Sequence, residues 1–212
     1  MHRAKAVADV DVTGDMPESA PVPALLRQDA CLVVLGSRGL GGFGGLLLGS
    51  TAVQVAAHAR CPVVVVRGER SGDVVVGVDG SEHSVEAIAF AFAEAQRLGV
   101  GVLALTITPW GLLDTVPAGV LLADDDDPEP ARALAESIAG WAEKYPEVPV
   151  RRAVARGHVS RTLTELAADA ALLVVGSRGE GGFRGLLLGS VSQGVLQHAD
   201  CPVAIVRPKA LD

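Results

Sequence analysis

Short predicted strands alternate with predicted helices along most of this chain. Apolar runs without alternation, such as residues 31–35 and 171–175, are typical of strands that are buried on both faces of a parallel sheet. Apolar residues at helical spacing extend over residues 81–99 and again over residues 131–143. Further strands are predicted at residues 63–66, 74–79, 102–107, 150–154 and 203–206. Alternating strands and helices indicate an α/β fold with right-handed crossovers between parallel strands.

An internal repeat lies within this pattern. Residues 29–67 align without gaps on residues 169–207 at an offset of 140 residues, and 25 of these 39 positions are identical. Each copy consists of a strand, a glycine-rich loop, a helix and a second strand. We expect the hydroxyls of Ser50 and Ser190 to cap the two helices by accepting a backbone N–H. The repeat therefore marks a duplicated structural unit.

The first copy is predicted to be incomplete. Residues 6–12 correspond to the strand at residues 150–154, but no upstream segment corresponds to residues 74–107. We therefore expect a truncated unit at residues 1–68 and a complete unit at residues 73–208. Because buried backbone groups must be paired, a sheet without its central strands is expected to be completed by a partner chain or by a start further upstream.

Composition narrows the class of protein. Apolar residues make up 49% of the chain and aromatic residues 3%, which predicts a core of alanine, valine and leucine. The net charge is -7 without a basic cluster, so neither nucleic acid nor an anionic membrane is expected as a partner. Cys31, Cys61 and Cys201 form an odd set without metal-ligand spacing, and the N-terminus has no apolar targeting segment. We expect a cytoplasmic protein with reduced thiols and no metal site.

The second glycine-rich loop carries the candidate chemistry. It begins at Gly176 after a predicted buried strand and ends at Ser190, where a helix begins. The backbone N–H groups of such a loop approach phosphate oxygens closely, and the helix N-terminus adds about half a positive charge. Ser190 and Ser192 add hydroxyls, and Arg178 is the cation best placed to assist. Asp79 follows a strand that ends at the same edge of the sheet, where it is placed to accept hydrogen bonds from a ribose or a base.

These residues resemble the ATP-binding subclass of the universal stress protein family. The family's pattern, Gly-x2-Gly-x9-Gly-Ser/Thr, occurs twice, at Gly176, Gly179, Gly189 and Ser190 and at Gly36, Gly39, Gly49 and Ser50. The segment at residues 77–81 also looks like the family's opening strand and turn. The resemblance implies a Rossmann-like, adenine nucleotide alpha hydrolase-like fold, in which a five-stranded parallel sheet carries helices on both faces. It also implies ATP as the ligand, with Mg²⁺ as an accompanying ion, and a homodimer that forms through the last strand.

The resemblance assigns the ATP site residue by residue. The matching positions are Gly77, Asp79, Ile107, Gly176, Ser177, Arg178, Gly179, Gly181, Gly182, Gly189, Ser190, Val191 and Ser192. Of these, Gly77, Asp79 and Ile107 are expected on the adenine side. The first repeat lacks the strand that would supply its aspartate. We therefore expect a degenerate second site, formed by Gly36, Gly39, Gly49 and Ser50.

Alternative interpretations stay open at this point. The glycines of each loop could serve only a tight turn between strand and helix, and Asp79 could be only a capping residue ahead of Ser81. The main hypothesis is an ATP-dependent regulatory module in a stress response. A slow ATPase or phosphotransferase is a second hypothesis, although the loop has no lysine and no paired carboxylate or Ser/His/Asp set is evident. A nucleotide-free scaffold for protein contacts is the third.

Overall fold

The computed structural model describes residues 11–37, 48–68, 71–109, 120–122, 129–181 and 187–208. In chain order its elements are α2 (Pro21–Leu26), β1 (Val33–Gly36), α3 (Ser50–His58), β2 (Val63–Val66), β3 (Val74–Gly77), α4 (Glu82–Leu98), β4 (Val102–Thr108), β5 (Val120–Leu122), α5 (Glu129–Lys144), β6 (Val150–Arg156), α6 (Val159–Leu166), β7 (Leu172–Gly176), α7 (Ser190–His198) and β8 (Val203–Val206). The strand predicted at residues 6–12 lies largely outside the described residues.

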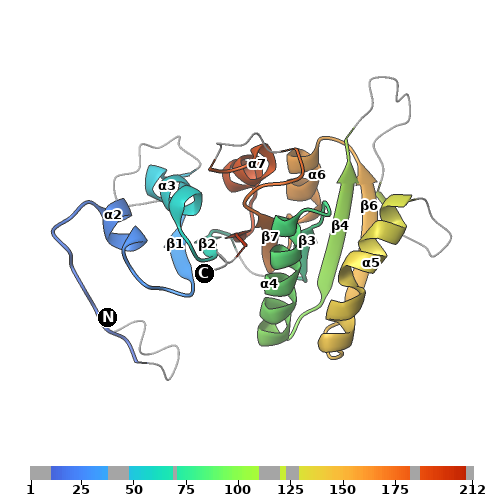
Figure 1. Ribbon diagram of the computed structural model, residues 1–212, viewed down its shortest axis with the longest axis horizontal. Helices are drawn as coiled ribbons and strands as arrows, with labels where there is room; N and C mark the ends of the chain where they lie inside the picture. Colours follow the sequence, from blue (N-terminus) through green and yellow to red (C-terminus); the bar gives the residue numbers. More distant parts are fainter. Residues whose placement is uncertain are drawn as a thin grey trace.

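The described strands form one eight-stranded sheet in the order β1-β2-β8-β7-β3-β4-β6-β5 (Figure 1). The strands β8, β7, β3, β4 and β6 are neighbours in this order and pair in parallel. Because β5 pairs antiparallel with β6, it extends the sheet at one edge. The predicted α/β fold with a five-stranded parallel sheet is confirmed, within a larger sheet.

The first repeat joins this sheet through its last strand. Strand β1 pairs in parallel with β2, and β2 pairs antiparallel with β8, so that Val64 lies opposite Ala204. The two last strands of the two repeats therefore lie side by side in opposite directions. Strand β1 is left at the edge of the sheet, and Val34 on this strand is 56% exposed.

Helices cover both faces of the parallel part of the sheet, as predicted. Along β3, Val74 and Val76 belong to the apolar core on one face, which also contains side chains of α4 and α5, and Val75 belongs to the core on the other face, with side chains of α3, α6 and α7. All three valines are at most 3% exposed. Successive side chains of a strand point to opposite faces, so the unbroken valine run suits a strand that is buried on both.

The starts of the helices match the sequence prediction at α4 and differ from it at α3 and α7. The hydroxyl of Ser81 accepts the Ser84 N–H and caps α4, as expected. Ser50 and Ser190 make no side-chain cap, so that prediction was wrong. Gly49 and Gly189 are the N-cap residues, because the extended backbone of each loop continues to the glycine and the helix begins at the serine.

Two helices that the sequence analysis did not locate extend the repeat. Helix α6 precedes β7 and packs against α7, and helix α2 precedes β1 and packs against α3. Shifted by the 140-residue offset, α6 corresponds to residues 19–26, which include all of α2. The structural repeat is therefore longer than the segment in which the two copies share residues.

Candidate functional site

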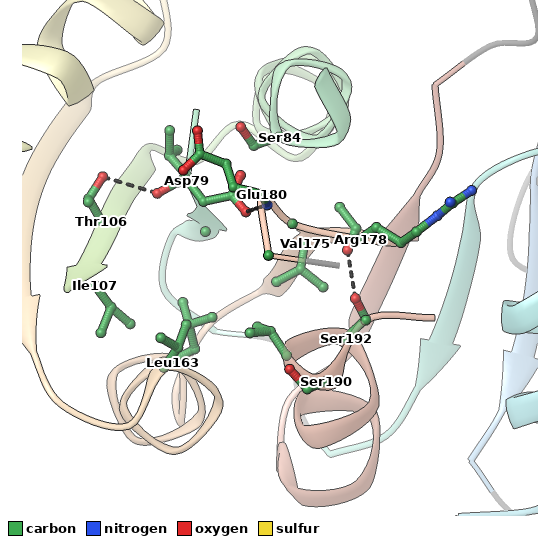
Figure 2. A pocket seen from close by; sticks show the side chains of 18 of the residues that line it. Asp79, Ser84, Thr106, Ile107, Leu163, Val175, Arg178, Glu180, Ser190 and Ser192 are labelled. Carbon is green, nitrogen blue, oxygen red and sulfur yellow. Dashed lines mark hydrogen bonds between the residues drawn. The ribbon is translucent and has the colours of Figure 1, made fainter. Parts of the chain in front are cut away.

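A cavity of about 530 Å³ lies at the carboxyl end of the parallel strands. The ends of β3 and β4 and part of α6 line one side, and the loop after β7 and the start of α7 line the other (Figure 2). In doubly wound α/β folds the carboxyl edge of the sheet is the place where ligands bind. The cavity is therefore the candidate functional site.

Most residues assigned to the site from the sequence line this one cavity. They are Gly77, Asp79, Ile107, Gly176, Arg178, Gly179, Gly181, Gly189, Ser190, Val191 and Ser192. Ser177 is fully buried behind the wall of the cavity and does not line it. Gly182 lies outside the described residues. The topology thus brings Ile107 of β4 together with two segments about 100 residues apart, one after β3 and one after β7.

Asp79 fastens these two segments to each other. Its Oδ1 accepts hydrogen bonds from the N–H and the hydroxyl of Ser81, at 3.0 and 2.6 Å. Its Oδ2 accepts the N–H of Glu180 at 3.3 Å, in the loop after β7. A Cβ at Gly179 would lie only 2.3 Å from the same Oδ2, so glycine is required for this approach. Asp79 both stabilises the start of α4 and lines the cavity. A capping role and a place in the candidate site are therefore compatible for this residue.

Buried hydroxyls hold the loop in place from behind. The Ser192 hydroxyl lies 2.8 Å from the Gly176 carbonyl oxygen and 3.0 Å from that of Ser177. The Ser177 hydroxyl forms a 3.0 Å hydrogen bond with Nδ1 of His83, at the start of α4. A Cβ at Gly176 would lie 2.8 Å from the His83 Cβ. The Ser192 hydroxyl, predicted to contact phosphate, is therefore engaged with the backbone of the loop.

Two arginines, Arg178 and Arg207, influence the protonation of His83. Burial lowers the pKa of His83, and the positive charges of Arg178 and Arg207 lower it further. The carboxylates of Glu82 and Asp79 oppose this shift. The folded chain therefore favours the neutral imidazole.

Arg178 has an orientation that its position in the motif does not predict. Its backbone borders the cavity, but Figure 2 shows its side chain directed away from the cavity. Its Nε is buried and has no hydrogen-bond partner among the described residues. In this conformation the guanidinium faces the region between the two repeats, where Arg207 lies nearby.

The apolar part of the wall was only partly predicted. Leu163 of α6 and Val175 of β7 line the cavity together with Ile107, the apolar residue assigned from the sequence. Thr106 and Thr108 flank Ile107 and also line the cavity, as does Glu180 in the loop. The two threonines are sequence neighbours of Ile107, and Glu180 is a sequence neighbour of Gly179. They could therefore have been predicted as neighbours of residues already assigned to the site. Leu163 gave none, because α6 was not located.

The glycine-rich loop of the first repeat ends in the same backbone hydrogen bond as the second loop but has different neighbours. The Gly49 N–H donates to the Ser37 carbonyl at 2.8 Å, just as the Gly189 N–H donates to the Ser177 carbonyl at 2.8 Å. Gly36 is exposed at the end of the edge strand β1, and Gly39 lies outside the described residues. In the second repeat, β3 lies beside β7. In the first repeat, no described strand lies on the corresponding side of β1. Gly36, Gly49 and Ser50 thus do not line the cavity.

The described residues contain no group of three or more histidine, cysteine or acidic side chains that could hold a metal ion. In the same part of the chain, no helix is long and apolar enough to cross a membrane.

Comparison with known proteins identifies the class to which this fold and site belong. The model of the universal stress protein family matches residues 3–67 and 71–207. The chain therefore belongs to the universal stress protein family.

Individual relatives agree with this assignment. A universal stress protein of Mycolicibacterium smegmatis is 45% identical over 190 residues, which cover 86% of this chain and 63% of the relative. A universal stress protein of Mycobacterium tuberculosis is 40% identical over 211 residues, which cover 92% of this chain and 68% of the relative. The chain thus spans about two thirds of the length of these relatives. The crystal structure of a universal stress protein from Archaeoglobus fulgidus has the same fold, with a TM-score of 0.65 and 21% identity over 93% of this chain and 68% of that one.

Proposed function

We propose that the chain binds an adenine nucleotide, with ATP as the working ligand, in the cavity at the carboxyl end of the sheet. The observation that carries this proposal is that the cavity has two chemically different sides. Ile107 and Leu163 supply an apolar wall, whereas the glycine-rich loop and the N-terminus of α7 lie opposite (Figure 2). An apolar wall suits a purine base, and a helix N-terminus that follows a glycine-rich loop suits phosphate.

Individual residues fit this ligand. The carboxylate of Asp79 has lone pairs beyond those used by Ser81 and Glu180, so it has capacity to accept a ribose hydroxyl. Gly179 and Gly189 carry no side chain that would keep phosphate oxygens from the backbone N–H groups. Since the described residues offer no cluster of metal ligands, an accompanying Mg²⁺ would be held mainly by phosphate oxygens and water.

Binding is favoured over turnover by the residues that line the cavity. No lysine or histidine is among the described residues that line it, and their carboxylates are Asp79, which is held by three hydrogen bonds, and Glu180. We therefore propose a nucleotide-dependent regulatory module of a stress response. Slow hydrolysis assisted by Glu180 is the alternative that this site leaves open, and phosphate release that a Glu180→Gln variant loses would support it.

The two-repeat organisation is part of the proposal. We propose a truncated unit at residues 1–68 and a complete unit at residues 73–208, with the single nucleotide site in the second. The outer edge of β8 is paired with β2, so a homodimer through the last strand requires β2 to be displaced. We therefore propose that β2 takes the place of a second copy. Three cysteines without a disulfide fit a cytoplasmic location.

Calorimetric titration with ATP tests the proposal directly. The wild-type chain is expected to bind about one equivalent, and a Gly179→Val, Ser190→Ala variant is expected to lose at least about tenfold in affinity, because a side chain blocks the approach to the loop backbone. The matched control is Gly39→Val in the first repeat, which should leave binding unchanged. Circular dichroism melting of each variant separates loss of binding from loss of fold. Absence of binding by the wild type would favour the scaffold hypothesis.

A further inference from the structure

Two arginines clamp the two repeats together in a reciprocal way. Arg207, directly after β8, donates through Nη2 to the carbonyls of Ala56, at 3.1 Å, and Ala57, near the C-terminus of α3. Arg67, directly after β2, donates to the carbonyls of Leu196 and Ala199 at the C-terminus of α7, at 2.6 and 2.9 Å. The last carbonyls of a helix lack partners within it, and a cation there complements the helix dipole. Each repeat thus caps a helix of the other.

The two clamps lie at opposite edges of the sheet, because β2 and β8 run antiparallel. Arg207 lies at the carboxyl edge of β8, the edge that carries the cavity. Its Nη2 also donates to the carbonyl of Leu187 at 2.9 Å, in the glycine-rich loop two residues before Gly189. One guanidinium therefore holds both the loop and α3. Arg67 lies at the far edge, and its contacts are with the opposite end of α7.

Arg207 and Arg178 carry like charges near each other at the glycine-rich loop. Arg178 belongs to the same glycine-rich loop, where a Cβ added at Gly189 would lie 3.3 Å from the Arg178 Cα, and Arg207 contacts this loop at Leu187. Burial lowers the pKa of Arg207, and the positive charge of Arg178 lowers it further. Neither arginine forms an ion pair with a carboxylate among the described residues. Two like charges near each other in a half-buried place repel, and a bound anion would relieve that repulsion.

We propose that Arg207 is a positioning residue that couples a polyphosphate bound in the glycine-rich loop to helix α3 of the first repeat. The inference rests on the proposed nucleotide site and adds its regulation. Phosphates in the loop stabilise the charged guanidinium where it holds Ala56 and Ala57, and the clamped guanidinium holds the Leu187 carbonyl and thereby the shape of the loop. Coupling of this kind is reciprocal, so nucleotide binding and closure of the contact between the repeats strengthen each other. The effect grows with phosphate charge, so ATP acts more strongly than AMP.

Titration calorimetry with ATP and with AMP, combined with hydrogen exchange of the full chain, tests this coupling. In the wild type, ATP should bind more tightly than AMP and slow amide exchange in α3. In Arg207→Gln the ratio of ATP to AMP affinity should fall by about tenfold, within the usual range of coupling between sites, and α3 should no longer respond to ATP. Arg207→Lys keeps the charge and should restore part of the ratio.

Arg67→Gln is the matched control, because it removes the same kind of helix clamp at the edge away from the cavity. It should lower the melting temperature to a similar degree but keep both the affinity ratio and the response of α3. An unchanged ratio of ATP to AMP affinity in Arg207→Gln, or an equal fall of this ratio in Arg67→Gln, would overturn the proposed coupling. The proposed nucleotide site would still be supported in that case if AMP binds. If the wild type binds neither nucleotide, the proposed function fails and the coupling fails with it.

Discussion

The two glycine-rich loops have nearly the same sequence and very different surroundings. Each begins at the end of a strand, and in each the N-cap glycine donates to the carbonyl of the serine after that strand, Ser37 in the first repeat and Ser177 in the second. In the second repeat, β3 lies next to β7, and the start of α4 covers the loop through His83. In the first repeat, β1 is the edge strand, and Gly36 is exposed.

This difference teaches that the loop alone does not make a binding site. Its backbone N–H groups and its helix N-terminus are present in both copies, but the apolar wall comes from β4 and α6, and the carboxylate from the end of β3. Those elements all lie between the two repeats, at residues 74–166. The motif occurs twice, but among the described residues only the second loop lines the cavity.

The largest expected effect is a difference in stability between variants of α6 and α2, the helices that precede the two loops. Leu163 of α6 is 2% exposed and contributes both to the core and to the cavity wall. Leu163→Ala should lower the free energy of unfolding by about 2–5 kcal/mol, because it leaves a void in a packed core. Leu25 of α2 is only partly buried, and Leu25→Ala should cost about 1 kcal/mol. Urea unfolding of both variants measures the contrast, and equal costs would show that α2 and α6 support their loops equally.

A second, smaller contrast concerns the first glycine of each loop. A Cβ at Gly176 would lie 2.8 Å from the His83 Cβ and 2.9 Å from its backbone carbon, so Gly176→Val should destabilise the fold by about 1–3 kcal/mol. Gly36 is exposed at the edge of the sheet, and Gly36→Val should change stability by no more than about 0.5 kcal/mol. Thermal melting checks both values. A cost at Gly36 as large as that at Gly176 would mean that its loop, too, is covered.

The sequence was sufficient to predict the parallel sheet and most of the cavity. Valine runs such as 74–76 gave the buried strands, and the rule that parallel strands present their carboxyl ends at one edge brought Asp79 next to the loop at Gly176. These are consequences of local pattern and topology. Helix α2 was missed because prolines stand at its first and third positions, and α6 because its short sequence is mostly polar.

The remaining features depend on contacts between residues far apart in the chain. Arg207 reaches Ala56 across 151 positions, and His83 meets Ser177 across 94. No local pattern encodes such a pair, since each depends on β2 pairing with β8 or on α4 crossing β7. The orientation of Arg178 belongs to the same class, because a glycine motif places its backbone and leaves its side chain free to turn away from the cavity.

The smallest contrast is a dependence on pH that only the second loop should have. The pKa of His83 is lowered in the folded chain, chiefly by burial, so the unfolded chain binds this proton more tightly. The free energy of unfolding should therefore be unaffected by His83 above about pH 7 and should fall as the pH drops below the ordinary histidine pKa of about 6.5.

Urea unfolding at pH 7.5 and pH 5.5 measures this dependence. A His83→Gln variant should lose less stability between the two values than the wild type. Ser177→Ala, which removes the hydroxyl partner of the imidazole, should also alter the slope, whereas Ser37→Ala in the first repeat should leave it as it is. If stability changes equally with pH in the wild type and in His83→Gln, the acid sensitivity arises elsewhere in the chain. The packing of α4 on the second loop would then not make His83 a determinant of the pH dependence.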